Sequence, residues 1–171
     1  MTKVYLAGGF FSDKQAKDLK NTRKMLEKNV TVGDIYSPQD HQSKEVFGTT
    51  AWKKETFMAD CKAMREADTI VATLTDGELD TGTIWELGFA YALNKVVILV
   101  TDQEMLNLML AESFNGIIIN TESGIMKDVM HMEDDIEQTS SKVTHEIDLT
   151  KIDFNSVTAG TGLNGWIETV E

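Results

Sequence analysis

Two carboxylates stand where a group-transfer reaction would use them, and the first is Glu86. It lies in the run DTGTIWELG (80–88), which follows an apolar strand pattern and opens a helix. The helix dipole stabilises a carboxylate in the first turn, so the run predicts a Glu86 that stays ionised at neutral pH, as a carboxylate nucleophile requires. The same residues also form a T-x-x-E capping box from Thr83, in which Glu86 would only cap its own helix.

The second carboxylate is Asp60, on a helix predicted over about 51–66. Phe57, Cys61 and Met64 have the i, i+4, i+7 spacing of a core face, and Asp60 lies on the flank of that face. Partial burial there would raise the pKa of the carboxyl group and let it carry a proton. The alternative is a boundary residue that hydrogen-bonds to a neighbouring loop.

Other side chains near these carboxylates suit a substrate with hydroxyl groups and a planar ring. Asp80 would accept hydrogen bonds from substrate hydroxyls, or merely stabilise a turn with Gly82. Gln42 carries an amide that can read the edge of a base, or that is only solvated. Three aromatic residues would stack on a planar base or pack in the core: Tyr5, Phe11 and Trp52.

Other kinds of chemistry have little support. The run AGGFF (7–11) is neither G-x-G-x-x-G nor a P-loop, so no dinucleotide or nucleoside triphosphate site is expected. The acidic run 131–137 lacks the alternate carboxylates of a calcium loop, and Cys61 within a helix favours packing. Metal-ligand spacing is absent from the three histidines, His41, His131 and His145. The sequence therefore predicts no metal and no cofactor.

Alternating strand and helix patterns would position these residues. Apolar, β-branched runs predict strands over 3–9, 29–38, 69–74, 95–101 and 116–120. Helices are predicted over 13–28, 51–66, 84–94 and 104–113. The first of these helices starts with an S-x-x-Q capping box from Ser12 to Gln15. The pattern predicts an α/β fold with a single doubly wound, five-stranded parallel sheet, flavodoxin- or Rossmann-like, and helices on both faces.

In such a sheet, ligands bind beyond the carboxyl ends of the strands. The loops expected to form the site are 7–12, 37–49, 75–83 and 101–107. Residues 121–150 are polar and acidic without a firm pattern, which indicates a loop or a peripheral insertion.

Composition and charge limit the partners. The chain has 171 residues, 42% hydrophobic and 26% charged, which suits one globular domain. The net charge is −12, with 16 acidic and 13 basic side chains up to residue 111, and 12 acidic and 3 basic side chains in 112–171. Such a surface repels phosphate backbones, so nucleic acid is excluded as a partner and an uncharged small substrate is favoured.

Three features predict a cytoplasmic protein with no membrane partner. No apolar run approaches the ~20 residues that span a bilayer. The N-terminal run MTKVYLAGGFF has no signal-peptide core followed by a cleavage site. Cys61 is the single cysteine of the sequence and has no partner for an internal disulfide.

The chain resembles the nucleoside 2-deoxyribosyltransferases of lactic acid bacteria and related bacilli. The resemblance covers roughly residues 3–120. It rests on five features: Tyr5 with the AGGFF loop, Ser37-Pro38 followed by Gln42, Trp52 eight residues before Asp60, the run 80–88, and Asn107-Leu108-Met109. The run 80–88 and the later N-L-M are its most specific parts.

The resemblance implies a role for each residue of the site. Glu86 would attack the anomeric carbon, Asp60 would protonate and later deprotonate the base, and Tyr5 would help position the nucleophile. Asp80 would bind the 5′-hydroxyl, and Asn107 would reach the site of a neighbouring subunit near the same hydroxyl. The base and sugar pocket is expected to include Gln42, Phe11, Gly9, Trp52 and Met109.

The implied reaction is a retaining double displacement that moves 2-deoxyribose between purine or pyrimidine bases through a covalent deoxyribosyl-glutamate. The partners would be deoxynucleosides and free nucleobases. Members of the family form homo-oligomers, commonly hexamers built from dimers. Residues 1–120 would be the nucleoside-binding catalytic core, with 121–171 as an acidic extension packed on the same domain. That extension departs from the family, whose members end soon after the last strand.

Three other functions compete with this one. A deoxynucleoside 5′-monophosphate N-glycosidase ranks second, because Asp80 would repel the phosphate and its loop lacks Arg and Lys. In a non-catalytic nucleotide-sensing module Glu86 would only cap its helix, and an orphan structural α/β domain would bind no ligand.

Overall fold

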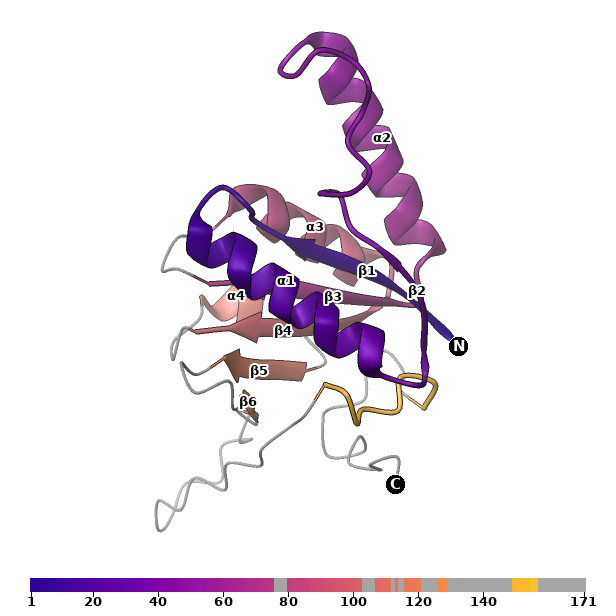
Figure 1. The fold of residues 1–171 in the computed structure, drawn as a ribbon, viewed down its shortest axis with the longest axis vertical. Coiled ribbons are helices and arrows are strands. Elements are labelled where there is room, and N and C mark those ends of the chain that lie inside the picture. Colours follow the sequence, from indigo (N-terminus) through magenta and orange to yellow (C-terminus); the bar gives the residue numbers. More distant parts are fainter. Residues whose placement is uncertain are drawn as a thin grey trace.

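The computed structural model describes residues 1–75, 80–102, 107–111, 113, 116–120, 126–128 and 149–156. A sheet in the order β2-β1-β3-β4-β5-β6 forms the centre of the molecule (Figure 1). The parallel strands are β1 (Thr2–Gly8), β2 (Val32–Tyr36), β3 (Thr69–Leu74), β4 (Val96–Thr101) and β5 (Gly116–Asn120). Their order of 2-1-3-4-5 is that of flavodoxin-like folds, so the predicted α/β class and parallel sheet are confirmed.

The sixth strand was not predicted. β6 (Met126–Asp128) pairs antiparallel with β5 at the edge of the sheet, so the interpretation of 121–150 as loop or insertion is wrong for these residues. A three-residue edge strand is held by backbone hydrogen bonds, and it is too short to leave a recognisable apolar period.

Four helices connect the strands. They are α1 (Asp13–Lys28), α2 (Thr50–Glu66), α3 (Thr81–Ala92) and α4 (Leu108–Ala111). The capping box of α1 is confirmed, because Ser12 and Gln15 each bond to the other's backbone N–H. α1 covers one face of the sheet, whereas α3 and α4 cover the other (Figure 1). Of the helix predicted over 104–113, residues 104–106 and 112 lie outside the described part of the chain.

Alternation along β1 divides the core into two layers. Val4 and Leu6 pack in the cluster that includes Leu19 and Leu26 of α1. Tyr5 and Ala7 point to the opposite face, where Met64 of α2 and Leu87 of α3 are buried. A strand buried on both faces reads as a continuous apolar run, which explains why β1 was readily recognised. The same alternation places the Tyr5 side chain beneath α2 and α3.

A close contact at the end of β1 requires Gly8. Its φ is +155°, and an added Cβ would lie 2.1 Å from Thr73 Oγ1 on β3. Because any side chain would clash there, glycine lets the chain leave the sheet next to β3 and turn into α1.

The C-terminal region contributes to the core through 149–156. Leu149 and Phe154 are buried in the cluster on the α1 side. The Asn29 side-chain amide donates to the carbonyls of Leu149 and Ile152, at 2.7 and 2.8 Å. This segment is therefore fixed to the turn that follows α1, while the division of the chain at residue 120 stays a prediction.

The N-terminal half of α2 extends past the edge of the sheet (Figure 1). The buried residues of this helix are Cys61 and Met64, near its C-terminal end. Phe57 is 51% exposed, so its expected place in a core face is wrong. Helical spacing predicted which residues share one side of α2, but it could not predict how far along the helix the sheet reaches.

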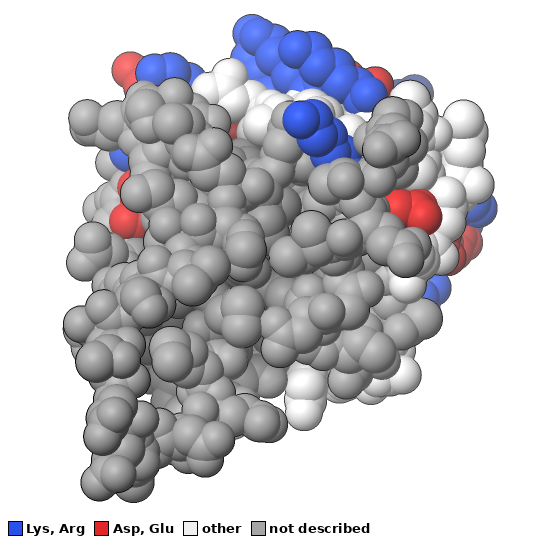
Figure 2. Space-filling view, turned by 90° about the horizontal axis from the view of Figure 1, so that it is seen from below, with Lys and Arg blue, Asp and Glu red and all other residues white. Residues whose placement is uncertain are grey.

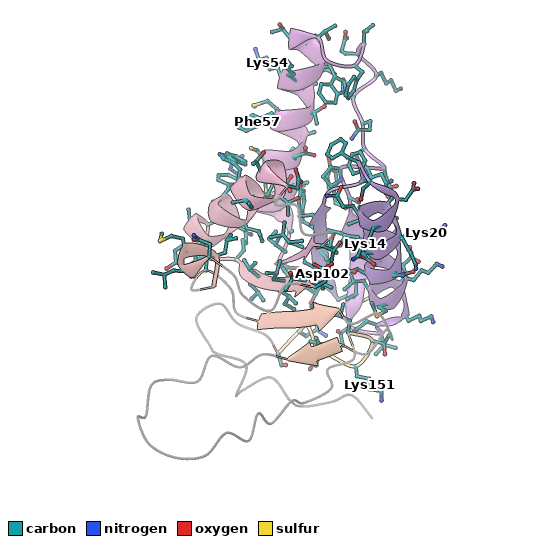
Figure 3. The ribbon with its side chains drawn as sticks, turned by 90° about the vertical axis from the view of Figure 1, so that its left-hand side faces the viewer. Lys14, Lys20, Lys54, Phe57, Asp102 and Lys151 are labelled. Atoms are coloured by element: carbon teal, nitrogen blue, oxygen red, sulfur yellow. The ribbon has the colours of Figure 1, made fainter. Side chains whose placement is uncertain are left out.

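Basic side chains concentrate on α1, which carries Lys14, Lys17, Lys20, Arg23, Lys24 and Lys28. Figure 2 shows lysine and arginine side chains gathered along one margin of the molecule. Lys14 Nζ lies 2.8 Å from both Asp18 and Asp102 and thereby ties the first turn of α1 to the end of β4 (Figure 3). Within the described ranges, no helix combines the length and apolarity that crossing a bilayer would require.

Candidate active site

Glu86 lies in the second turn of α3, with its carboxylate bonded to β1. The Tyr5 hydroxyl donates to Glu86 Oε1 at 2.6 Å. The N-cap of α3 is Asp80, whose carboxylate accepts from the backbone N–H groups of Gly82 and Thr83. The helix therefore begins three residues earlier than predicted. The proposed capping box from Thr83 to Glu86 is wrong, and Glu86 is free of a capping role.

The protonation of Glu86 also differs from the expectation. Its surroundings together raise its pKa from 4.5 to about 7. Burial is the largest cause and raises the pKa, the hydrogen bond from Tyr5 lowers it, and the nearby charges of Asp60 and Asp80 raise it. Because Glu86 is not in the first turn, the helix dipole does not offset the cost of burying its charge. At neutral pH the carboxyl group is divided between its two forms.

We expect Tyr5→Phe to raise the pKa of Glu86 above about 7. Burial and the charges around it keep the pKa of Tyr5 well above its usual value, so the hydroxyl stays a donor and stabilises the ionised carboxylate. Phenylalanine keeps the ring and removes the donor. A ¹³C-NMR titration of labelled glutamate carboxyls would measure the shift, with Tyr91→Phe, an exposed tyrosine on the same helix, as the control. An unchanged Glu86 titration would contradict this account of the bond.

Asp60, on α2, is held from β2. The Tyr36 hydroxyl donates to Asp60 Oδ1 at 3.2 Å. Burial raises the pKa of Asp60, while the Tyr36 bond and the charge of His41 lower it. Its carboxyl group therefore holds a proton more readily than an exposed aspartate, although Tyr36 and His41 both oppose the effect of burial.

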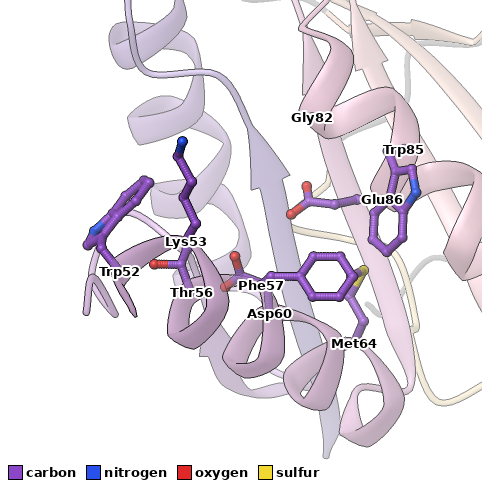
Figure 4. A pocket seen from close by; sticks show the side chains of 9 residues that line it. All are labelled: Trp52, Lys53, Thr56, Phe57, Asp60, Met64, Gly82, Trp85 and Glu86. Carbon is purple, nitrogen blue, oxygen red and sulfur yellow. The ribbon is translucent and has the colours of Figure 1, made fainter. Parts of the chain in front are cut away.

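The two carboxylates line one pocket of about 400 Å³ between α2 and α3. Figure 4 shows Glu86 reaching from α3 toward α2, on the side where the carboxyl group of Asp60 lies. The remaining lining residues are Trp52, Lys53, Thr56, Phe57, Met64, Gly82 and Trp85. Two acidic groups from different helices thus share one cavity with few other polar groups.

Aromatic side chains form much of the pocket wall. Phe57 of α2 and Trp85 of α3 meet with ring centroids 5.2 Å apart, and Trp85 stacks on Phe89 at 5.2 Å. At the other end of the pocket, Trp52 packs against Phe47 at 4.6 Å. Such walls suit a flat, mostly apolar ring, with the carboxyl groups supplying its polar contacts.

Four of the residues singled out from the sequence come together around this pocket. Asp60, Glu86 and Trp52 line it, and Tyr5 lies behind Glu86. Asp80 is next to it as the cap of α3, adjacent to the lining residue Gly82.

The other five lie outside the pocket lining. Gln42 donates to the Pro38 carbonyl at 2.5 Å, Phe11 is 76% exposed against Phe10, and Gly9 is packed on Gln15. The Asn107 side chain accepts from the backbone N–H of Met109, which is 77% exposed. Gly9, Phe11, Gln42 and Asn107 belong to segments that follow strands, and Met109 belongs to α4. A sequence pattern indicates that such residues lie near the carboxyl edge of the sheet, but it does not give the orientation of their side chains.

Sequence reasoning missed several residues near the carboxylates. Lys53, Thr56, Phe57 and Trp85 line the pocket, and Tyr36 and His41 support Asp60. The sequence did contain a signal for the pocket residues on α2. Positions 52, 56, 60 and 64 are four residues apart and therefore lie on one side of a helix, which places Thr56 beside Trp52 and Asp60. Tyr36 also ends a parallel strand, which is where ligand sites form.

The geometry supports two-carboxyl chemistry on a glycosidic bond. One carboxylate attacks or stabilises a developing cation, while the other carboxyl group delivers a proton to the leaving group. In the part of the chain that the structure describes, no three His, Cys, Asp or Glu side chains gather as they would around a metal ion.

Proteins similar to this chain in sequence and in fold carry names that agree with such chemistry. The family model described as nucleoside 2-deoxyribosyltransferase matches residues 4–153. The nucleoside deoxyribosyltransferase of Limosilactobacillus fermentum is 33% identical over 108 residues, which are 58% of this chain and 64% of that protein. The match thus spans less than two thirds of that relative.

Solved structures show the same fold. The 2-deoxyribosyltransferase of Bacillus psychrosaccharolyticus is similar with a TM-score of 0.63 and 34% identity, over 67% of this chain and 84% of that one. The CMP N-glycosidase of Clostridium botulinum has a TM-score of 0.50 at 20% identity, over 71% of this chain and 93% of that one, and shares the fold alone.

Proposed function

The chain belongs to the nucleoside 2-deoxyribosyltransferase family, and we propose that it moves 2-deoxyribose from one nucleobase to another through a covalent bond to Glu86. The observation that carries the proposal is the pairing of Glu86 and Asp60 in one pocket, with Tyr5 bonded to Glu86. A deoxynucleoside supplies what this pocket suits: a planar base for its aromatic walls and an uncharged sugar for its carboxyl groups.

In the first half of the reaction, the bond from the base to the anomeric carbon breaks. Positive charge develops on the sugar and is stabilised by ionised Glu86, whose carboxylate then bonds to the same carbon. Asp60 gives its proton to the departing base. In the second half, Asp60 takes a proton from the incoming base, which displaces Glu86. Two displacements at one carbon retain its configuration.

The active form of the carboxyl pair carries one proton. Glu86 must be ionised and Asp60 protonated, although burial gives the free protein a Glu86 pKa of about 7. Both carboxyl groups draw on the same proton, so they titrate as a pair. A developing sugar cation beside Glu86 favours its ionised form, and the proton then resides on Asp60, where the base needs it.

Asp80, the N-cap of α3, favours a nucleoside as substrate over a nucleotide. A phosphate would bind to the free N–H groups at the start of a helix. Here the Asp80 carboxylate already accepts from Gly82 and Thr83 and carries a negative charge. The uncharged 5′-hydroxyl of a nucleoside can donate to Asp80, whereas a 5′-phosphate would be repelled.

A deoxynucleoside 5′-monophosphate N-glycosidase is the second candidate, because Lys53 brings a cation to the pocket lining. We expect Asp80→Ser to shift preference toward the monophosphate by about tenfold in the ratio of kcat/KM values, since serine caps the helix without the charge. Paired assays on deoxyinosine and its 5′-monophosphate would measure that ratio. Equal ratios in Asp80→Ser and the wild-type protein would remove Asp80 as the selecting residue.

Transfer itself is tested with deoxyinosine and free adenine, following deoxyadenosine by chromatography. Formation of deoxyadenosine supports the transferase. Release of hypoxanthine without deoxyadenosine would indicate hydrolysis, and no reaction would leave a binding protein.

The proposal includes a homo-oligomer in which Asn107 completes the site of a neighbouring copy. Leu108 and Met109, beside Asn107, are 69% and 77% exposed. Contiguous exposed apolar surface rimmed by polar residues marks interaction sites, and in the proposed oligomer these two side chains contribute to such a surface. Sedimentation of the wild-type protein would give the oligomeric state.

A further inference from the structure

Tyr36 has no part in the chemistry described so far, yet it is the side chain that holds Asp60. It ends β2, and its hydroxyl donates to Asp60 Oδ1 at 3.2 Å. Burial and the charge of Asp60 raise the pKa of Tyr36 to about 12, so the phenol keeps its proton at neutral pH. Tyr36 therefore keeps the hydrogen that it donates to Asp60 in this bond.

The ring of Tyr36 is itself fixed by two other rings. It stacks on Tyr5 with centroids 5.5 Å apart and on His41 with centroids 4.1 Å apart, at interplanar angles of 14° and 15°. His41 Nδ1 lies 2.9 Å from the Ser37 carbonyl, which can only accept, so this nitrogen carries a hydrogen. The stack therefore connects the tyrosine behind Glu86 to the tyrosine behind Asp60.

We infer that Tyr36 is the positioning residue that selects which oxygen of Asp60 handles the proton. This inference rests on the proposed transfer function. Because Oδ1 accepts from Tyr36, the acidic proton of Asp60 resides on Oδ2. During bond cleavage, that proton moves from Oδ2 to a ring nitrogen of the departing base, and it returns to Oδ2 from the incoming base. The Tyr36 proton stays on its own oxygen throughout.

Other ionisable groups around Asp60 come from every neighbouring element. Tyr5 comes from β1, His41 from the chain after β2, Glu86 from α3, and Lys53 from the same helix as Asp60. None of the contacts in the described residues duplicates the Tyr36 bond to Oδ1. Removing that hydroxyl therefore leaves the charges in place and changes the donor alone.

The test compares two substrates in Tyr36→Phe, which keeps the stacked ring. Deoxyinosine needs a proton on its leaving base. An aryl 2-deoxyriboside with p-nitrophenolate as leaving group needs none. We expect the rate of the first bond cleavage, measured as the pre-steady-state burst of leaving-group release, to fall about tenfold for deoxyinosine, the effect of one hydrogen bond, and to change little for the aryl substrate. Both KM values should change little. Tyr91→Phe, an exposed tyrosine, is expected to match the wild-type protein on both substrates.

A second measurement does not depend on turnover. In a ¹³C-NMR titration of labelled aspartate carboxyls, with Asp60→Asn to assign the signal, Tyr36→Phe is expected to raise the pKa of Asp60. An equal loss on both substrates, no loss on either, or an unchanged Asp60 titration would each overturn the inference. If the wild-type protein cleaves neither substrate, the transfer function fails, and the titration still decides whether Tyr36 holds Asp60.

Discussion

Glu86→Gln is expected to abolish base exchange, with kcat falling at least ~10³-fold, because glutamine keeps the shape of the side chain but cannot form the bond to the sugar. Intact-mass measurement would detect a deoxyribosyl adduct on the wild-type protein mixed with deoxyinosine, and none on the variant. Glu27→Gln, which changes an exposed glutamate on α1, is the control and should form the adduct. Retained exchange in Glu86→Gln would end the proposed mechanism.

The same variant should be more stable than the wild-type protein above neutral pH. The pKa of Glu86 is 4.5 as a free side chain and about 7 when folded, so the folded protein binds this proton more tightly. Stability from that difference is complete below pH 4.5 and is lost as the pH rises through 7. Glutamine cannot ionise, so its advantage in thermal unfolding should appear at pH 8 and vanish near pH 4. This comparison also shows that lost activity is not lost folding.

Asp60→Asn is expected to lower kcat for deoxyinosine by about 10²- to 10⁴-fold, the usual contribution of a general acid. Asparagine occupies the same space and can still accept from Tyr36, but it has no acidic proton. The p-nitrophenyl deoxyriboside should lose far less in its first step, because its leaving group departs as an anion. Burst kinetics of p-nitrophenolate release would separate that step from the second.

A matched control for Asp60→Asn is Asp34→Asn, which changes an exposed aspartate on β2. It should leave both substrates unaffected. If Asp60→Asn slowed the two substrates equally, Asp60 would act on the sugar or on the fold and not as the acid.

Much of the fold could be predicted because its signals are local or periodic. β3 was predicted over its observed bounds, and the Ser12 cap fixed the start of α1. The start of α3 was missed because two capping patterns overlap. Asp80 and Thr83 are both residue types that cap helices, and only the backbone N–H groups bonded to the Asp80 carboxylate show that Asp80 is the cap. β6 was missed because a short antiparallel edge strand is held by backbone bonds to its partner strand and does not require an apolar pattern in its own sequence.

The candidate site was predictable in its chemistry and less so in its geometry. Glu86 and Asp60 stood out as carboxylates in suitable contexts, and the structure gives them a shared pocket. The raised pKa of Glu86 is caused mainly by burial among its neighbours, which an argument from the helix dipole does not include. Contacts between different elements, such as those of Tyr36 with Asp60 and His41, cannot be predicted from the spacing of residues within one helix or strand.

The uneven burial of α2 bears on the fate of the proposed covalent intermediate. Trp52, Lys53 and Thr56 form a pocket wall on a helix whose buried anchors, Cys61 and Met64, lie near its other end. A segment with so few buried contacts opens at low free-energy cost, without disturbing the sheet. In the proposed mechanism, each opening would admit water to the glycosyl ester on Glu86 before the acceptor base arrives. The proportions of new nucleoside and free deoxyribose would then depend on how firmly the N-terminal half of α2 is held against its neighbours.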